Sequence, residues 1–157
     1  MTERAYEKYA WIILFAVAVI FALFGIGDLV QGSAADTAIV EGITGMTPDE
    51  IEAADPRIRV LIDQQARAGG GAFLVLGLLA AGIAWTSFRR GERWSWYALW
   101  TLPLLNVLIF VGMYVSVDFA TGVLPPPLLS APIFLGITVV GLLLPIRRFF
   151  GSKTAAE

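Results

Sequence analysis

Apolar residues gather into four long runs along the chain, at residues 10–30, 68–88, 96–117 and 128–146. Each run has close to the roughly 20 residues that a helix needs to cross a hydrocarbon layer about 30 Å thick. No run alternates apolar and polar residues with a period of two, so the pattern favours helices, which satisfy their own backbone hydrogen bonds in lipid. We therefore predict a single all-α domain over residues 1–157, an integral membrane bundle of four transmembrane helices.

The polar segment at residues 31–67 joins the first two runs and contains two helix start signals. Thr47, Pro48 and Glu50 in "TPDE" match an N-cap, a first-turn proline and a capping box, and Asp55 with Pro56 repeats the start. Beyond Pro56, one stripe runs along a helical face: Ile58, Leu61, Ile62 and Gln65. We predict an amphipathic helix that leads into the second span. A solvated connector without a partner is the alternative.

Consecutive glycines, Gly69 to Gly71, open the second run and suggest at first a phosphate-binding loop. A dinucleotide fingerprint needs a small residue where Leu74 stands, and no Walker lysine follows, so we assign these glycines to a membrane helix. Small residues recur at helical spacing in the first two runs, which lets helix backbones approach closely. We predict that these two helices pack through Ala18, Ala22, Gly25, Gly70, Gly77 and Ala81.

The composition agrees with a membrane protein and excludes much catalytic chemistry. Hydrophobic residues make up 57% of the chain and charged residues 15%, whereas soluble proteins average about a quarter charged. Cysteine and histidine are absent, which excludes disulfides, thiol nucleophiles, imidazole bases and cysteine or histidine metal sites. We predict no catalytic residue, no metal and no cofactor. The net charge of −2 also argues against a nucleic-acid partner.

Charges are distributed unevenly between the two sides of the predicted bundle. Acidic residues gather in residues 31–67, whereas basic residues flank the other ends of the runs: Arg4, Lys8, Arg89, Arg90, Arg93, Arg147, Arg148 and Lys153. The positive-inside rule then predicts a multi-pass protein of the cell membrane with both termini cytoplasmic and residues 31–67 extracytoplasmic. The tryptophans fall at the inner interface: Trp11, Trp85, Trp94, Trp96 and Trp100. They fit an aromatic belt or, alternatively, a clamp for a head group or ligand.

Polar residues within the runs or at their ends are the candidates for function, because burying a polar group in lipid is costly unless it has a partner. Asp28, Arg67 and Asp118 are expected at one outer level, where Asp28 pairs with Arg67 and the cluster holds an ion or an amphiphile head group. The alternative is that they reach water and pin the helix ends. Asn106 and Thr138 lie near the middle of the third and fourth runs, so we predict a hydrogen bond between them that sets helix register.

The segments "FGIGDLVQG", "EGITGMTPDEIEAADP", "RAGGGAFLVLGLL" and "FRRGERWSWYALW" together resemble uncharacterised small prokaryotic four-span membrane proteins, similar to the DoxX-like group. The resemblance covers the first two thirds of the chain better than the last third. It implies the fold and the topology, and it brings no catalytic residues.

Two classes of function follow from these features. The first is a non-catalytic membrane module surrounded by membrane lipids, which self-associates or serves as an accessory subunit of a larger membrane complex. The second is a binder or enzyme for a hydrophobic small molecule, such as a lipid or a quinone, held between the helices with its polar end at Asp28, Arg67 and Asp118. A small channel or exporter is a third reading.

Overall fold

The computed structural model describes residues 5–151, and every regular element in that range is a helix, which confirms the predicted all-α class. Arg4 and Lys153, which contributed to the predicted charge asymmetry, lie outside the described residues. The longer helices are α1 (Ala5–Gln31), α4 (Pro56–Ile83), α6 (Thr101–Ser116) and α7 (Pro127–Leu143). The shorter ones are α2 (Thr37–Thr44), α3 (Pro48–Ala54), α5 (Arg93–Leu99) and α8 (Ile146–Phe150), with single turns η1 (Gly32–Ala34), η2 (Ala84–Phe88, a π-helix) and η3 (Phe119–Thr121).

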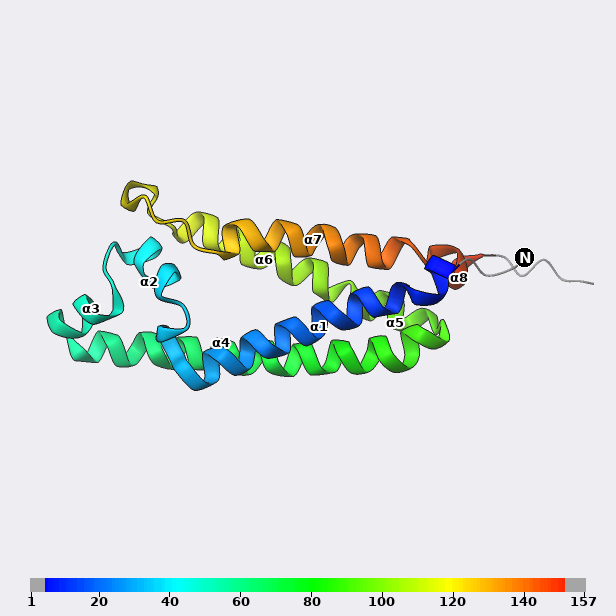
Figure 1. The fold of residues 1–157 in the computed structure, drawn as a ribbon, viewed down its shortest axis with the longest axis horizontal. Helices are drawn as coiled ribbons and strands as arrows, with labels where there is room; N and C mark the ends of the chain where they lie inside the picture. The colour runs from blue at the N-terminus through cyan, green and yellow to red at the C-terminus, as the bar shows by residue number, and fades with distance from the viewer. Residues whose placement is uncertain (1–4, 152–157) are drawn as a thin grey trace, which may run out of the picture.

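The long helices form two pairs, α1 with α4 and α6 with α7, as Figure 1 shows. The pairs meet at the end of the molecule that carries α5 and α8, where α1 also contacts α7. They diverge toward the other end, which carries α2 and α3. The molecule is therefore closed at one end and spread at the other.

The closed end contains the hydrophobic core. Leu14, Val17 and Phe21 of α1 pack there with Leu99, Leu142 and aromatic rings of η2 and α8, and these side chains are almost completely buried. The rings of Phe88 and Phe149 lie 4.8 Å apart, centroid to centroid. This packing holds the two helix pairs together at the closed end.

Three of the helical stretches, at Glu7–Ala34, Pro56–Phe88 and Arg93–Ser116, are long and apolar enough to cross a membrane. The fourth apolar helix, α7, has 17 residues, at the lower end of the range that a span requires. Leu23, Leu78 and Val115 illustrate the outward face of these helices, since each is more than half exposed. Large apolar side chains thus cover much of the outer surface.

Helix boundaries differ from the sequence prediction at two prolines. The fourth helix was expected to reach residue 146 but ends at Leu143, because Pro145 has no N–H with which to continue the hydrogen-bond ladder. The third run is divided at Trp100 into α5 and α6. Pro103 explains this break, since it cannot donate to the carbonyl of Leu99 and is well accommodated in the first turn of a new helix.

The outer segment has the predicted start signals. The Thr47 hydroxyl accepts a hydrogen bond from the Glu50 N–H while the Glu50 carboxylate accepts one from the Thr47 N–H, so the capping box is confirmed. Asp55 accepts from the N–H of Arg57 at 2.9 Å and begins α4, which continues from the amphipathic segment into the second apolar run without a break. The prediction missed α2, which ends at Gly45 in a left-handed conformation.

The α1 and α4 backbones touch at their glycines. A Cβ atom added at Gly77 would lie 2.5 Å from the backbone nitrogen of Ala22 and 2.7 Å from the carbonyl oxygen of Ala18. One at Gly70 would lie 2.6 Å from Cβ of Asp28, and one at Gly25 would overlap the α4 backbone in the same way. These distances leave no room for any side chain.

A leucine at Gly77 therefore tests the α1–α4 contact. We expect Gly77→Leu to lower the free energy of unfolding by about 1–3 kcal/mol or more, because backbone atoms must move apart to admit the side chain. Gly82→Leu is the matched control, since Gly82 lies on the same helix and has no atom within 4 Å of its Cβ position. The stability of both variants is compared through their unfolding midpoints in detergent. Equal midpoints for Gly77→Leu and Gly82→Leu would contradict a close α1–α4 contact at Gly77.

Candidate ligand cavity

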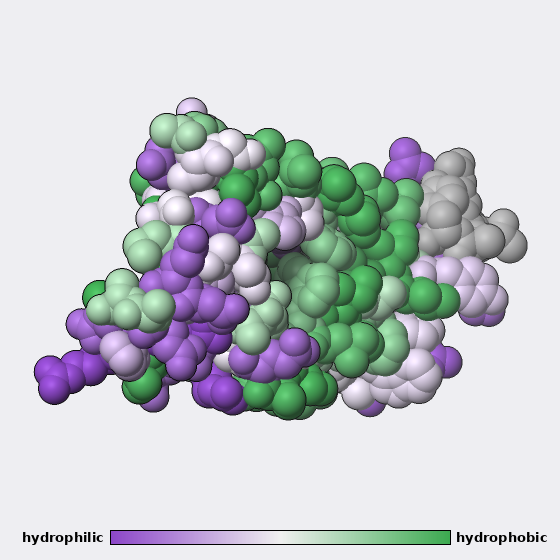
Figure 2. Space-filling view, turned by 60° about the vertical axis from the view of Figure 1, so that its left-hand side comes forward, coloured by the Kyte–Doolittle hydropathy of each residue, from purple (hydrophilic) through white to green (hydrophobic). Residues whose placement is uncertain are grey.

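A cavity of about 640 Å³ occupies the spread end of the molecule, between the two helix pairs and α2. Figure 2 shows a recess at the boundary between a largely apolar part of the surface and a part rich in polar residues. Most of the lining is apolar, and four phenylalanines and a methionine contribute to it: Phe21, Phe24, Phe73, Phe134 and Met113. The ring centroids of Phe21 and Phe134 lie 5.5 Å apart.

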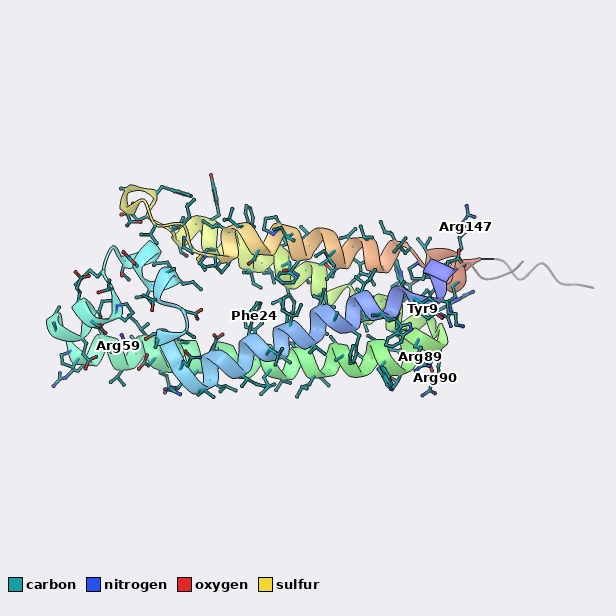
Figure 3. The ribbon with its side chains drawn as sticks, in the orientation of Figure 1. Tyr9, Phe24, Arg59, Arg89, Arg90 and Arg147 are labelled. Atoms are coloured by element: carbon teal, nitrogen blue, oxygen red, sulfur yellow. The ribbon has the colours of Figure 1, made fainter. Side chains whose placement is uncertain are left out.

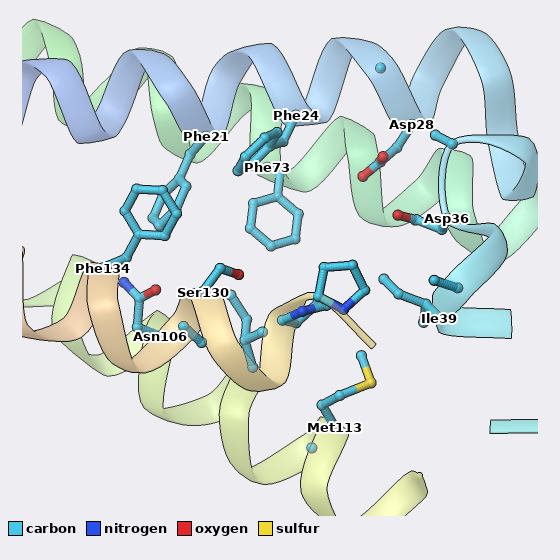
Figure 4. Close-up of a pocket in the computed structure, with 18 of the residues that line it drawn as sticks. Phe21, Phe24, Asp28, Asp36, Ile39, Phe73, Asn106, Met113, Ser130 and Phe134 are labelled. Atoms are coloured by element: carbon cyan, nitrogen blue, oxygen red, sulfur yellow. The ribbon is translucent and has the colours of Figure 1, made fainter. Parts of the chain in front are cut away.

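The charged residues that line the cavity are two aspartates, Asp28 on α1 and Asp36 just before α2. Figure 4 shows both carboxylates on the cavity side of their elements, beside each other. Asp36 occupies the N-cap position of α2, but its side chain makes no capping hydrogen bond. Partial burial and the nearby Asp28 charge raise the pKa of the Asp36 carboxyl from 3.8 to about 6.

Asn106 and Ser130 contribute polar groups farther along the cavity wall. The Asn106 side chain is 1% exposed, and its Nδ2 donates to the Leu102 carbonyl oxygen at 2.9 Å. Thr138 is also buried, but its hydroxyl donates to the carbonyls of its own helix, at 2.8 Å for Phe134. The predicted Asn106–Thr138 hydrogen bond was therefore wrong: each side chain bonds to the preceding turn of its own helix, a common arrangement for short polar side chains in helices.

Arg67 does not pair with Asp28, contrary to the prediction. Its Nη1 donates to the carbonyl oxygens of Leu29 and Val30, the latter at 3.1 Å. These carbonyls belong to the last turn of α1, where backbone acceptors lack helical partners and the helix dipole favours a cation. Arg67 therefore caps the end of α1 and does not line the cavity.

Asp118 also lies apart from the expected cluster. It is exposed and does not line the cavity. Its carboxylate accepts from the Ala120 N–H at 2.9 Å and caps η3, while its own N–H donates to the Gly42 carbonyl at 2.9 Å. Of the three predicted residues, the structure places only Asp28 in the site.

Sequence reasoning missed Asp36, the second acid of the cavity. Gly32 has a positive φ of 61°, which turns the chain back after α1 and brings Asp36 next to Asp28. The sequence signal was a glycine at the end of an apolar run followed by an acid a few residues later. An acid directly before Thr37 is more readily interpreted as an ordinary N-cap.

The predicted interface tryptophans lie away from the cavity, in the first part of α1, in η2, and in or directly after α5: Trp11, Trp85, Trp94, Trp96 and Trp100. Trp11 and Trp85 meet edge to face at 5.1 Å, with the Arg89 guanidinium 5.2 Å from each ring. Trp96 Nε1 donates to the Leu142 carbonyl at 2.9 Å and so joins α5 to α7. The five predicted interface tryptophans therefore include some that lie on the surface and some that pack between helices.

Comparison of the chain with protein-family models, with curated proteins and with solved structures finds no match. The resemblance to the DoxX-like group thus stays a prediction. Among residues 5–151, no group of three or more acidic, histidine or cysteine side chains could hold a metal ion. The fold and the site together define a helical protein with long apolar helices and an apolar cavity that carries acids at one end.

The raised pKa of Asp36 predicts a pH-dependent stability. The folded state binds the Asp36 proton more tightly than the unfolded state, so the contribution of Asp36 to stability is greatest below pH 4 and decreases as the pH rises through about 6. The Asp36→Asn side chain cannot ionise, so the variant avoids this decrease in stability as the pH rises. We expect its unfolding midpoint to exceed that of the wild type at pH 7.5 and to equal it at pH 4.

Glu52→Gln is the control, because Glu52 is an exposed acid of α3 outside the cavity. Its midpoint should follow the wild type at both pH values. An Asp36→Asn difference that is the same at pH 4 and pH 7.5 would show that Asp36 does not titrate in this way.

Proposed function

We propose that this protein is a multi-pass membrane protein that binds a hydrophobic small molecule with one polar end in the cavity between its helix pairs. The observation that carries the proposal is the cavity itself, about 640 Å³ in volume, apolar along its walls and acidic at one end. Ligand sites between bundle helices typically measure about 300–1,000 Å³ and combine apolar walls with a few placed polar groups. An amphiphile such as a lipid or a quinone fits this description.

The position of the cavity supports access from the lipid layer. Leu23, Phe24 and Leu108 line it and are also 59%, 52% and 60% exposed, so the apolar wall continues onto the apolar outer surface. A hydrophobic molecule can then move sideways from the bilayer into the cavity without crossing water. A module that only associates with other proteins has no need for such a cavity, and for this reason we favour the binding role over the structural one.

We place the protein with four spans, both termini in the cytoplasm and residues 31–67 outside. Figure 3 shows Arg89, Arg90 and Arg147 at the closed end, and Arg59 at the other end. Arg59 binds Asp63 at 3.4 Å within the acidic segment, so it adds little net positive charge there. An excess of cations at the closed end supports a cytoplasmic position for that end.

Single cysteines test the orientation, since the chain has none of its own. Ala53 on α3 and Arg90 beside η2 are both exposed, whereas Ser33 and Ser95 are buried and unsuitable. In intact cells we expect an impermeant maleimide to label Ala53→Cys and to label Arg90→Cys only after permeabilisation. The reverse result would overturn the orientation.

A glycine on the cavity wall allows the binding site to be filled. Gly27 lines the cavity and has no atom within 4 Å of its Cβ position, so Gly27→Leu should project into the cavity without distorting the fold. Gly82→Leu is the matched control on the outer surface. After purification in mild detergent, native mass spectrometry measures the small molecules that stay bound.

We expect wild type and Gly82→Leu to retain a defined small molecule and Gly27→Leu to lose it, with similar unfolding midpoints for all three. Retention of the same molecules by all three proteins, or of none by the wild type, would contradict the proposed function.

A further inference from the structure

We propose that the polar end of the ligand is an organic cation, an amine or a quaternary ammonium group, held by Asp28 and Asp36 with the alkyl part along the phenylalanines. This inference rests on the proposed function and specifies its ligand class. Behind it is the placement of two carboxylates, which have no hydrogen-bond or ion-pair partner among residues 5–151, at one end of an aromatic, apolar cavity.

The Asp36 carboxylate does not serve the local fold as a helix cap. An aspartate at an N-cap normally accepts a backbone N–H of the first helical turn, and Asp55 does this for α4. Asp36 stands at the same position before α2 and makes no such bond, and Figure 4 shows its side chain on the cavity side. The conformation gives up a normal stabilising contact and directs a charge toward the cavity.

The nearby cations of the described residues are occupied elsewhere. Arg67 donates to the carbonyls of Leu29 and Val30, and Arg59 contacts Asp63. Asp63 itself accepts the Ser33 N–H at 3.0 Å. None of the basic residues in this part of the chain lines the cavity, so Asp28 and Asp36 present two uncompensated negative charges to whatever occupies it.

Aromatic rings beside the carboxylates favour the same kind of ligand. Figure 4 shows Phe24 and Phe73 between Asp28 and the remaining phenylalanines. Ring faces attract ammonium groups, and most strongly where water is excluded. An anionic head group would instead be repelled by both carboxylates. A bare metal ion fits less well, because two carboxylates are fewer than the ligands that oxygen-binding cations take.

Three chain-matched photoreactive probes test the charge of the head group. Each has the same diazirine-bearing dodecyl chain, ending in an amine, an alcohol or a carboxylate. The full-length protein, in micelles of the uncharged detergent dodecyl maltoside, is irradiated with each probe, and the labelled residues are mapped by mass spectrometry. We expect the amine to label the cavity helices about tenfold more than the carboxylate.

Asp28→Asn/Asp36→Asn is the test variant and Asp118→Asn the matched control, because Asp118 is an acid outside the cavity. We expect the double variant to lose the preference for the amine while it retains labelling by the alcohol, which also reports that it is folded. Asp118→Asn should keep the preference.

The outcomes separate this inference from the function on which it rests. Cavity labelling by the alcohol with no preference for the amine overturns the cationic head group alone. An amine preference that survives in the double variant also overturns it. Absence of cavity labelling by all three probes overturns the proposed function as well.

Discussion

The direct contact between the α1 and α4 backbones is the constraint on which the rest of the structure depends. Gly25, Gly70 and Gly77 bring the helices so close that a Cβ atom at any of them would overlap the neighbouring helix, mostly its backbone. In the proposed membrane setting, helices gain no hydrophobic free energy by associating, so such a contact over many atoms supplies dispersion energy instead. It joins α1 and α4 into one closely packed unit. The α6–α7 pair meets this unit mainly at the closed end, where Leu14, Phe88 and Leu142 are buried.

The cavity follows from this asymmetry. Helices that are packed at one end and diverge at the other leave a space that the available side chains do not fill, and phenylalanines from α1, α4 and α7 line it. The turn at Gly32 then positions Asp36 beside Asp28 at the wide end. Arg67 is held by the last carbonyls of α1, so it does not neutralise these acids. The result is an apolar space with a negative end, which suits a positively charged amphiphile.

Local signals in the sequence predicted the elements better than the site. A cap such as Thr47 or Asp55 bonds to a backbone group of its own helix, and an apolar run lies within a single helix. Residue spacing alone therefore identifies both kinds of signal. Asn106, Arg67 and Asp118 were assigned to partners on other segments, and each uses a backbone group instead: Asn106 in its own helix, Arg67 at the end of α1 and Asp118 in its own turn. A pattern of residue types does not show this, because carbonyl groups are present at every position. Asp36 was missed because its placement depends on the direction of the chain after Gly32, which only the three-dimensional fold determines.

A density map of the protein in a lipid nanodisc, at a resolution that shows side chains, tests the central claim most directly. The account predicts an elongated non-protein density between α1 and α7, with one end in direct contact with the Asp28 and Asp36 carboxylates. A cavity closed by side chains, or a density whose polar end points away from both aspartates, would contradict it.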